Sequence, residues 1–453
     1  MTSTDSGTAT ARPTPPPTFG EALGVWFKIG LLSFGGPAGQ IAMMHRVLVD
    51  ERKWIAEKPY LAALNFCMLL PGPEAMQLAT YVGWRLHGLK GGLAAGLLFV
   101  LPGAVFMLLL STLYAIYGKL PLAEALFVGI KAAVLAIVVE ALLKVSRRAL
   151  KGTADWVVAA IAFVAIYALG VPFPVIVLAA GLFGYMRGGA AAAPTAPEAS
   201  VAALDHADHA PPSLRQTATT VAIWLAIWII PLLLVAAIFG RGHVLSELSW
   251  FFSKLAVVSF GGAYALLAYM AQEVVQGYGW LAPGEMLDAL GLAETTPGPL
   301  ILVNQFVGGL AAFRHGSDTL GIGPVGMGVV GAVVTLWATF APCFLWIFAG
   351  APWIERLNRN PQLKSALQSV TAAVVGVILN LTVWFGVHVL FGRVTTWTLG
   401  PLQPQIPDLT SVAPVSLALS LLAVILLFVL HRGIIVALLV CGALAVLWHQ
   451  LTP

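Results

Sequence analysis

Two short motifs rich in glycine and proline each occur twice in the chain, at one fixed spacing. The segment SFGGP at 33–37 returns as SFGG at 259–262, and PGP at 71–73 returns at 297–299. The offset in numbering is the same for both pairs, since 259 − 33 and 297 − 71 both equal 226. Glycine lets the backbone approach a ligand closely, and a helix N-terminus that follows such a break favours an anion. The motifs therefore predict an anion site built by both halves, with close packing of helices as the alternative.

Charged side chains lie next to these motifs. Lys28 and Lys254 stand five residues before the two SFGG segments, where two ammonium groups could neutralise a divalent oxyanion. Snorkelling to the membrane interface is the alternative role. Glu74 follows the first PGP, whereas Leu300 takes its place in the second half. An ionisable group beside a broken helix is usually functional, so we expect Glu74 to take up and release a proton, with helix capping as the alternative.

Amide side chains follow both PGP motifs, namely Gln77 in the first half and Asn304 and Gln305 in the second. Amides bind oxyanion oxygens without adding charge, although hydrogen bonding between helices is an equal alternative. We predict Glu74 for coupling and the following residues for substrate binding: Lys28, Ser33, Gly35, Gly36, Pro71, Gly72, Pro73, Gln77, Lys254, Ser259, Gly261, Gly262, Pro297, Gly298, Pro299, Asn304 and Gln305.

Two further ionisable residues, Lys131 and Glu140, are also absent from the second half. They are nine residues apart and face opposite sides of one helix, so we do not expect them to pair. Glu140 lies four residues before Lys144, which predicts an ordinary surface ion pair.

The duplication extends beyond the two motifs. Farther along the chain the offset becomes 240, with Pro102 matching Pro342 and AAV at 132–134 matching 372–374. The difference between the two offsets, 240 − 226 = 14, is the length of an insertion between Gly309 and Pro342. Duplicated hydrophobic segments interrupted by glycine and proline are typical of secondary transporters.

The composition predicts an all-α polytopic membrane protein. The chain is 59% hydrophobic and 10% charged, compared with about 25% charged residues in soluble domains. Several uncharged runs exceed the roughly 20 residues that a spanning helix needs: Gly91–Tyr117, Trp156–Met186, Thr219–Gly240, Thr319–Ile354 and Ser365–Gly392.

We divide the chain into four parts. Residues 1–18 form a disordered tail without the apolar core of a signal peptide, and 19–186 form the first membrane repeat. Residues 187–218 form a polar linker rich in Ala, Pro and His, and 219–453 form the second repeat, led by a connecting helix at 219–240. Because proline breaks helices, we expect broken or re-entrant helices at the glycine and proline motifs.

Loop charges predict that the two repeats have inverted topology. The loop 46–58 contains four Lys or Arg residues, whereas its copy at 272–284 contains none. Basic residues follow the first-repeat helix at 144–151, but they precede its copy, at 356–364. Basic loops face the cytoplasm, so the two copies would be upside down relative to each other.

Several function classes find no support. No nucleophile–base arrangement and no phosphate-binding Gly-Lys-Ser/Thr loop is present, and the histidines lack metal-ligand spacing. The three cysteines are far apart. We therefore expect neither an enzyme nor an ATPase, and no cofactor, bound metal or nucleic-acid partner.

Longer segments around the motifs resemble the chromate ion transporter (CHR) superfamily. The similar residues in the first half are SFGGPAGQIA at 33–42, MH at 44–45, LPGPEA at 70–75, QLATY at 77–81, GW at 83–84 and LHG at 86–88. The second half is similar through SFGGAY at 259–264 and TPGP at 296–299. The resemblance implies a long-chain, two-repeat, multi-pass protein of the bacterial inner membrane that exports chromate and confers chromate resistance.

Other functions remain open at this point. Sulfate is also a tetrahedral dianion, so it is a competitor or an alternative substrate, and a channel would lack coupling to a gradient. An intramembrane enzyme that uses Glu74, His45 or His87 is a further alternative, which two equivalent half-sites disfavour. The expected partners are chromate, the lipid bilayer and coupling protons, with a homodimer as one option.

Overall fold

The computed structural model describes residues 17–34, 36–190, 213–260, 263–318, 320–354, 360–396 and 405–452, and nearly all of them are helical. Six segments are long and apolar enough to cross a membrane, which confirms the predicted helical membrane protein: Glu74–Tyr117, Pro121–Ala149, Leu214–Phe239, Gly323–Trp353, Pro361–Leu390 and Ile434–Leu451. Large apolar side chains on these helices are exposed, among them Val105 and Leu439. Such a surface suits contact with lipid.

The helices divide into two series joined by α8. The first series is α1 (Phe19–Leu32), α2 (Gly36–His45), the π-helical turn η1 (Arg46–Glu51), α3 (Glu57–Leu69), α4 (Glu74–Tyr117), α5 (Pro121–Ala149), α6 (Thr153–Tyr167) and α7 (Phe173–Ala190). Helix α8 (Leu214–Phe239) follows. Helices α7 and α8 thus enter both ends of the predicted linker, and 191–212 lie outside the described residues.

The second series repeats the first. It contains α9 (Val244–Val258), α10 (Ala263–Gln272), η2 (Glu273–Gly277), α11 (Pro283–Thr295), η3 (Leu300–Leu302), α12 (Val303–His315), α13 (Gly323–Gly350), η4 (Ala351–Trp353), α15 (Pro361–Leu390), β1 (Val394–Thr396), β2 (Gln405–Pro407), η5 (Leu409–Ser411), α16 (Pro414–Val424), η6 (Ile425–Val429) and α17 (Ile434–Leu451).

The structure extends the duplication to the end of the chain. Helices α3 and α11 match at both ends with the offset of the motifs, since 283 − 57 and 295 − 69 both equal 226. The starts of α6 and α16, and those of α7 and α17, share an offset of 261 (414 − 153 and 434 − 173). The antiparallel β1–β2 hairpin stands between α15 and α16, where the offset grows from 240 to 261. Sequence identity alone did not reveal this third block.

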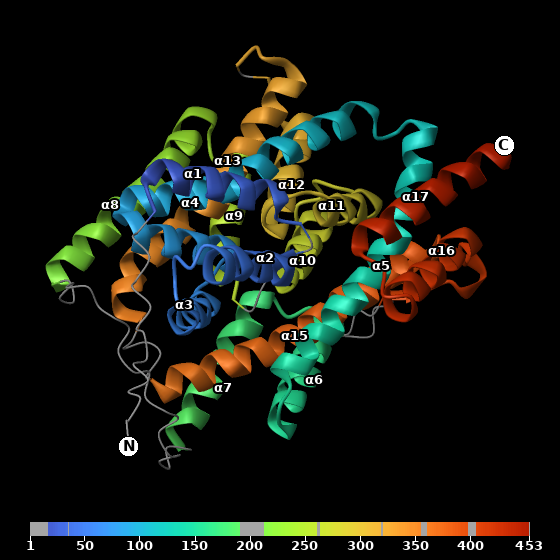
Figure 1. Ribbon diagram of the computed structural model, residues 1–453. Coiled ribbons are helices and arrows are strands. Elements are labelled where there is room, and N and C mark those ends of the chain that lie inside the picture. The colour runs from blue at the N-terminus through green and yellow to red at the C-terminus, as the bar shows by residue number, and fades with distance from the viewer. Residues whose placement is uncertain are drawn as a thin grey trace, which may run out of the picture.

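The last two helices of each repeat pack against a helix of the other repeat. Helix α15 of the second repeat packs against α6 and α7 of the first, whereas α5 of the first packs against α16 and α17 of the second. Figure 1 shows both groups, with α16 and α17 beside α5 and with α6 and α7 beside α15. The repeats are therefore interlocked rather than placed side by side.

The helices break at the predicted motifs. Backbone outside the helices separates α1 from α2, α3 from α4, α9 from α10, and α11 from η3. Helix α4 breaks again at His87 and Gly88, whose φ/ψ angles are not helical. Pro102 of α4 and Pro342 of α13, in contrast, lie within stretches that stay helical. The motifs thus interrupt helices, while prolines deeper in the repeats do not.

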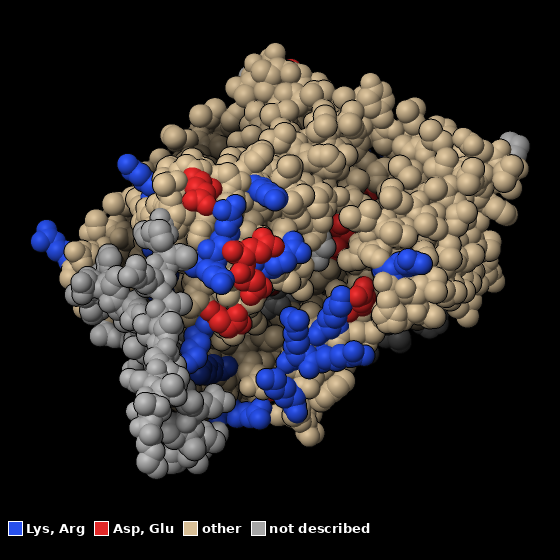
Figure 2. All heavy atoms as spheres, in the orientation of Figure 1, with Lys and Arg blue, Asp and Glu red and all other residues tan. Residues whose placement is uncertain are grey.

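Charged side chains are unevenly distributed over the surface. Figure 2 shows Lys, Arg, Asp and Glu side chains gathered over α2, α3 and the neighbouring parts of α5, α6 and α15, whereas the upper and right parts of that face carry very few. Arg46, Arg52 and Lys144 are exposed. The inverted orientation of the two repeats stays a prediction from the loop charges.

Candidate functional site

Three of the four motifs contain a described glycine in a turn conformation that only glycine adopts without strain. Gly36, Gly72 and Gly298 have φ angles of 71°, 118° and 88°, a region that side-chain-bearing residues rarely occupy. A Cβ atom at Gly72 would stand 2.8 Å from Gln77 Nε2 and 2.9 Å from Cys343 Sγ. Gly35, Gly261 and Gly262 lie outside the described residues. The turns therefore depend on glycine for both their conformation and their packing.

The turns of one repeat bind the turns of the other. The amide of Gly72 donates a hydrogen bond to the Ser259 carbonyl oxygen at 3.1 Å. The amide of Gly298 donates to the Ser33 carbonyl oxygen at 2.8 Å. The offset of the motifs relates the two bonds, since 298 − 72 and 259 − 33 are both 226. The PGP turn of each repeat thus donates a backbone hydrogen bond to the SFGG segment of the other repeat. We call the place where these four segments meet the crossing.

The middle of α4 and of α13 supports the crossing from behind, at matching positions. Gly103 of α4 lies so close to Pro297 that any Cβ atom would collide with the Pro297 carbonyl. Cys343 of α13, which matches Gly103 at the later offset (343 − 103 = 240), lies against Gly72. Each PGP turn therefore packs against the middle of a helix from the other repeat.

A small cavity lies at the crossing. It is lined by Pro37 and Gln40 of α2, by Pro73, Glu74 and Ala75 at the start of α4, by Ala263 at the start of α10, and by Pro299, Leu300 and Ile301 at η3, which leads into α12. Its walls are thus the N-terminal ends of three α-helices and of one 3₁₀ turn. Such ends present amide hydrogens and a partial positive charge. The cavity therefore favours negative charge without a cationic side chain in its walls.

The cavity is closed in this conformation. Its volume is about 10 Å³, which is near the smallest space that holds one water molecule. A tetrahedral oxyanion does not fit, so the turns must separate before such an anion can bind here.

Glu74 is the predicted residue with an ionisable group in the wall of this cavity. Gln40, which the sequence analysis did not select, also lines it and donates hydrogen bonds to the carbonyl oxygens of Gly298, at 2.6 Å, and Ser33, at 3.4 Å. Its counterpart in the second repeat is Leu266. The sequence did contain a signal for Gln40, because it is a polar residue within SFGGPAGQ at 33–40 and the matching segment of the second repeat has leucine there.

The predicted serines contribute backbone rather than hydroxyl groups to the crossing. Ser33 Oγ donates to the Ile29 carbonyl at 2.6 Å, and Ser259 Oγ donates to the Ala256 carbonyl at 3.0 Å. Both hydroxyls therefore close the last turn of their own helix. The serine carbonyls remain free to accept the bonds from the PGP turns.

The three predicted amides lie behind the cavity and bond to protein groups. Gln77 donates to the Pro71 carbonyl at 2.7 Å, and Gln305 donates to the Ala104 carbonyl at 3.0 Å. Asn304 donates to Thr339 Oγ1 at 3.3 Å. The side-chain oxygens of all three are buried and accept no hydrogen bond from the described residues. In this conformation the amides brace the turns, and none of them lines the cavity.

The two predicted lysines have different surroundings. Lys28 is exposed. The ammonium group of Lys254 lies over the rings of Phe251 and Tyr269, 5.7 and 5.6 Å from their centres. Neither lysine lines the cavity at the crossing. Their predicted role in anion binding therefore has no support from direct contact in this conformation.

Ionisable residues on α11 and α5 form a second group. Lys131 pairs with Asp288 at 3.2 Å, and Tyr114 donates a hydrogen bond to the same carboxylate at 2.7 Å. Glu140 pairs with Lys144 at 2.5 Å, which confirms the predicted surface pair. The sequence analysis missed Asp288, although Ala62 at the matching place (288 − 226) marks it as specific to the second repeat.

A larger cavity of about 290 Å³ lies between α6, α10, η2 and α15. Its polar lining comes from Tyr167, Gln272, Gln276, Asn380 and Gln405, and no Lys, Arg, Asp or Glu of the described residues lines it. None of the predicted site residues lies there. Helix α10 connects this cavity to the crossing, because α10 begins at the second SFGG turn.

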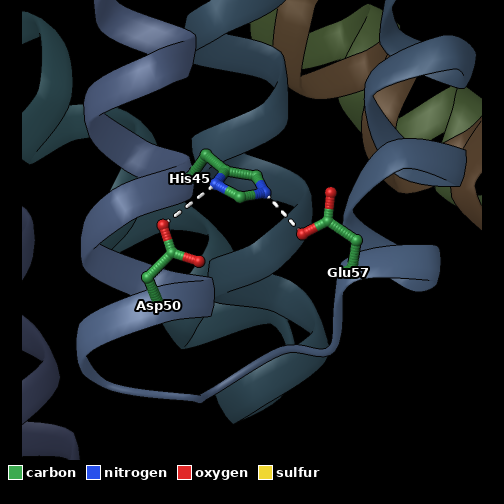
Figure 3. Close-up of side chains that lie close together, drawn as sticks. All are labelled: His45, Asp50 and Glu57. Carbon is green, nitrogen blue, oxygen red and sulfur yellow. Dashed lines mark hydrogen bonds and ion pairs between the residues drawn. The ribbon is translucent and has the colours of Figure 1, made fainter.

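One group of side chains has the composition of a metal site. Figure 3 shows His45 between two carboxylates, with Nδ1 3.4 Å from Asp50 and Nε2 2.6 Å from Glu57. A metal would take one imidazole nitrogen together with both carboxylates, but here each nitrogen faces a different carboxylate. The imidazole at the end of α2 instead bridges Asp50 of η1 and Glu57 of α3. Asp50 and Glu57 are also largely exposed.

Comparison with known proteins gives a consistent result. The family model for the chromate transporter matches residues 20–185 and 246–447. The chain is 33% identical over 399 residues to a chromate transport protein of Pseudomonas aeruginosa, covering 86% of this chain and 87% of that protein. It is 28% identical over 390 residues to a probable chromate transport protein of Synechococcus elongatus, covering 84% and 90%.

A chromate transport protein of Cupriavidus metallidurans is 27% identical over 373 residues, covering 82% of this chain and 83% of that protein. No solved structure matches the chain. The matched regions include all four turns of the crossing and most of both helical series. The chain therefore belongs to the chromate transporter family.

Proposed function

We propose that this chain is a secondary active transporter that binds chromate at the crossing and exports it across the bacterial inner membrane, which gives chromate resistance. Chromate is a tetrahedral dianion, and the proposal needs a site for negative charge inside a membrane protein. The observation that carries it is the meeting of helix N-termini from both repeats around one cavity. The relatives named for chromate transport support chromate as the substrate.

The closed cavity fits one stage of an alternating-access cycle. Two backbone hydrogen bonds hold the turns together, and each contributes only about 1 kcal/mol of net stability. An anion that inserts between the helix N-termini replaces these bonds with bonds to its own oxygens. Opening toward one side of the membrane at a time would then move the anion across.

We assign the coupling role to Glu74. It stands at the first turn of α4 and lines the cavity, and among the described residues no Lys, Arg or His side chain forms an ion pair with its carboxylate. An ionised Glu74 competes for the same helix N-termini as the substrate. A protonated Glu74 leaves them to the anion, so proton binding and anion binding are linked at this site.

Transport into inverted membrane vesicles tests the function. Vesicles that contain the chain should accumulate radiolabelled chromate above the outside concentration when a pH gradient is imposed, and vesicles without the chain should not. Uptake that stops at equal concentrations would indicate a channel. Excess sulfate shows whether the site separates two tetrahedral dianions, and the absence of any chromate flux would contradict the proposal.

A further inference from the structure

A buried carboxylate, Glu294, precedes the PGP turn of the second repeat, whereas Glu74 follows the PGP turn of the first. Glu294 belongs to the last turn of α11, three residues before Pro297, and is 6% exposed. Its carboxylate accepts a hydrogen bond from the Tyr264 hydroxyl at 2.9 Å. Within the described ranges, no Lys, Arg or His nitrogen forms an ion pair with it. Glu294 is therefore a buried acid whose hydrogen-bond donor is a neutral phenol.

Tyr264 connects this acid to the anion turns. It lies in the first turn of α10, and its hydroxyl oxygen stands 3.8 Å from the position that a Cβ atom would take at Gly36. Gly36 precedes Pro37, which lines the cavity. The path from the Glu294 carboxylate to the cavity thus runs through one phenol and one glycine turn.

The charged groups that surround Glu294 do not neutralise it. On α5 the groups that act on it are Glu140, which repels negative charge, and Lys144, which is already paired with Glu140 at 2.5 Å. Farther along α11, Asp288 has its own cation in Lys131. An ionised carboxylate is very costly in a buried site without a paired cation, whereas a carboxylic acid with one hydrogen bond is not.

The first repeat has no equivalent of this pair. Subtracting 226 from 294 and from 264 gives Met68 and Ala38. The acid and its phenol therefore belong to the second repeat alone, and packing that both repeats share does not require them. Intramembrane carboxylates that lack a structural partner usually carry protons or ions.

We propose that Glu294 is a second proton-binding residue of the transport cycle and that Tyr264 links its protonation to the anion cavity. The inference rests on the proposed anion site at the crossing. A proton taken from water by the Glu294 carboxylate removes one negative charge near the cavity, which favours a dianion there. By reciprocity, the bound dianion favours the proton on Glu294.

Chromate binding at several pH values tests the inference. The dissociation constant is measured for the full chain in detergent, for wild type and for Glu294→Gln, from pH 6 to 9. Chromate itself titrates in part of this range, but the ratio of the two dissociation constants cancels that contribution. One linked proton should make the wild-type constant rise by up to about tenfold per pH unit relative to the variant.

Parallel dissociation constants across the whole range would overturn the inference, because an unlinked Glu294 has no pH-dependent effect on anion affinity. A wild-type affinity that follows sodium concentration instead of pH would overturn it as well. Failure of the wild type to bind chromate at any pH would instead contradict the proposed function. The outcomes of the two proposals are therefore distinct.

Two matched variants guard against a folding artefact. Glu124→Gln removes an exposed carboxylate from α5, and its dissociation constants should equal those of wild type at every pH. Tyr264→Phe keeps the shape of the ring but removes the hydroxyl that joins Glu294 to the turn at Gly36, so the pH dependence of the chromate dissociation constant should weaken. If Tyr264→Phe matches wild type at every pH, the link through Tyr264 is wrong.

Discussion

The two repeats have the same arrangement of backbone turns, but different polar and ionisable side chains lie beside those turns. Both contribute an SFGG turn and a PGP turn to the crossing, and the hydrogen bonds between them are reciprocal. In the first repeat Gln40 and Glu74 line the cavity, whereas Leu266 and Leu300 stand at the matching places. In the second repeat, the ionisable side chain near the PGP turn is that of Glu294, which precedes the turn. The comparison teaches that backbone from both repeats forms the proposed anion site, while the polar side chains beside it differ between the repeats.

The largest expected difference between the repeats is their orientation. Arg147 lies in the last turn of α5, and Arg393 follows the matching helix α15. Both are accessible at the surface, so single cysteines at these positions should be labelled by an impermeant thiol reagent from opposite sides of the membrane. The three native cysteines are buried and are first replaced by serine or alanine. Labelling of both positions from one side would end the inverted-repeat prediction.

The next largest effect on chromate transport should come from replacing Gly103 and Cys343, which pack against the PGP turns, each by the residue found at the other position. Gly103→Cys places a side chain against the Pro297 carbonyl, so the turn must move and chromate transport should fall to background. Cys343→Gly removes a side chain and should cost no more than about 1–2 kcal/mol of stability. Flux per amount of protein in the membrane measures both, and equal effects would mean that the two supports are interchangeable.

Glu74→Gln should abolish accumulation of chromate driven by a pH gradient while chromate binding and exchange are kept. Glutamine fills the same space but cannot release a proton. As a control, Glu124→Gln, which removes an exposed carboxylate from α5, should leave gradient-driven accumulation in place. An equal loss of binding and of driven transport in Glu74→Gln would assign Glu74 to anion binding or to the fold.

Gln40→Leu makes the first repeat resemble the second at this position. It removes the donor to the Gly298 and Ser33 carbonyls, and one such buried bond contributes about 1 kcal/mol. We expect roughly a fivefold shift away from the closed state, read as greater labelling of a cysteine introduced at Ala263 in the cavity wall. The same labelling rate as in wild type would show that Gln40 does not hold the crossing.

The smallest effects should come from the two lysines. Because neither Lys28 nor Lys254 lines the cavity, replacement of either by glutamine should weaken chromate affinity by less than about tenfold, which corresponds to about 1.4 kcal/mol. The remaining effect is long-range attraction, and it should vanish in high salt. A larger loss in either variant would place that lysine in the open state of the site.

The sequence predicted the backbone turns of the site well, because the motifs that form them occur in both repeats. The fixed offset between SFGG and PGP copies identified Gly72, Gly298, Ser33 and Ser259 as a related set, and these residues do meet. Their pairing across repeats did not follow from the sequence, since a spacing says nothing about which half supplies the partner. The roles of Gln40 and Glu294 were missed because their partners lie 258 and 30 residues away.

The predictions about side chains were weaker for a physical reason. Equivalent positions guarantee equivalent places along a helix, but not equivalent faces or neighbours. Lys28 and Lys254 illustrate this, because one is exposed and the other lies over aromatic rings. The amides Gln77, Asn304 and Gln305 stand close to the turns as expected, yet they donate their hydrogen bonds to backbone carbonyls and to Thr339.

The reciprocal hydrogen bonds of the crossing have the form of an isologous dimer interface enclosed within one chain. In a dimer of identical single repeats, any substitution appears on both sides of the symmetry axis at once. A carboxylate added beside such a site would therefore bring a second one with it, and the two would repel each other. Fusion of the copies removes that constraint, so Glu74 and Glu294 can each occupy one half alone. After duplication, each repeat can therefore acquire substitutions that the other lacks, while the backbone hydrogen bonds between the repeats are kept.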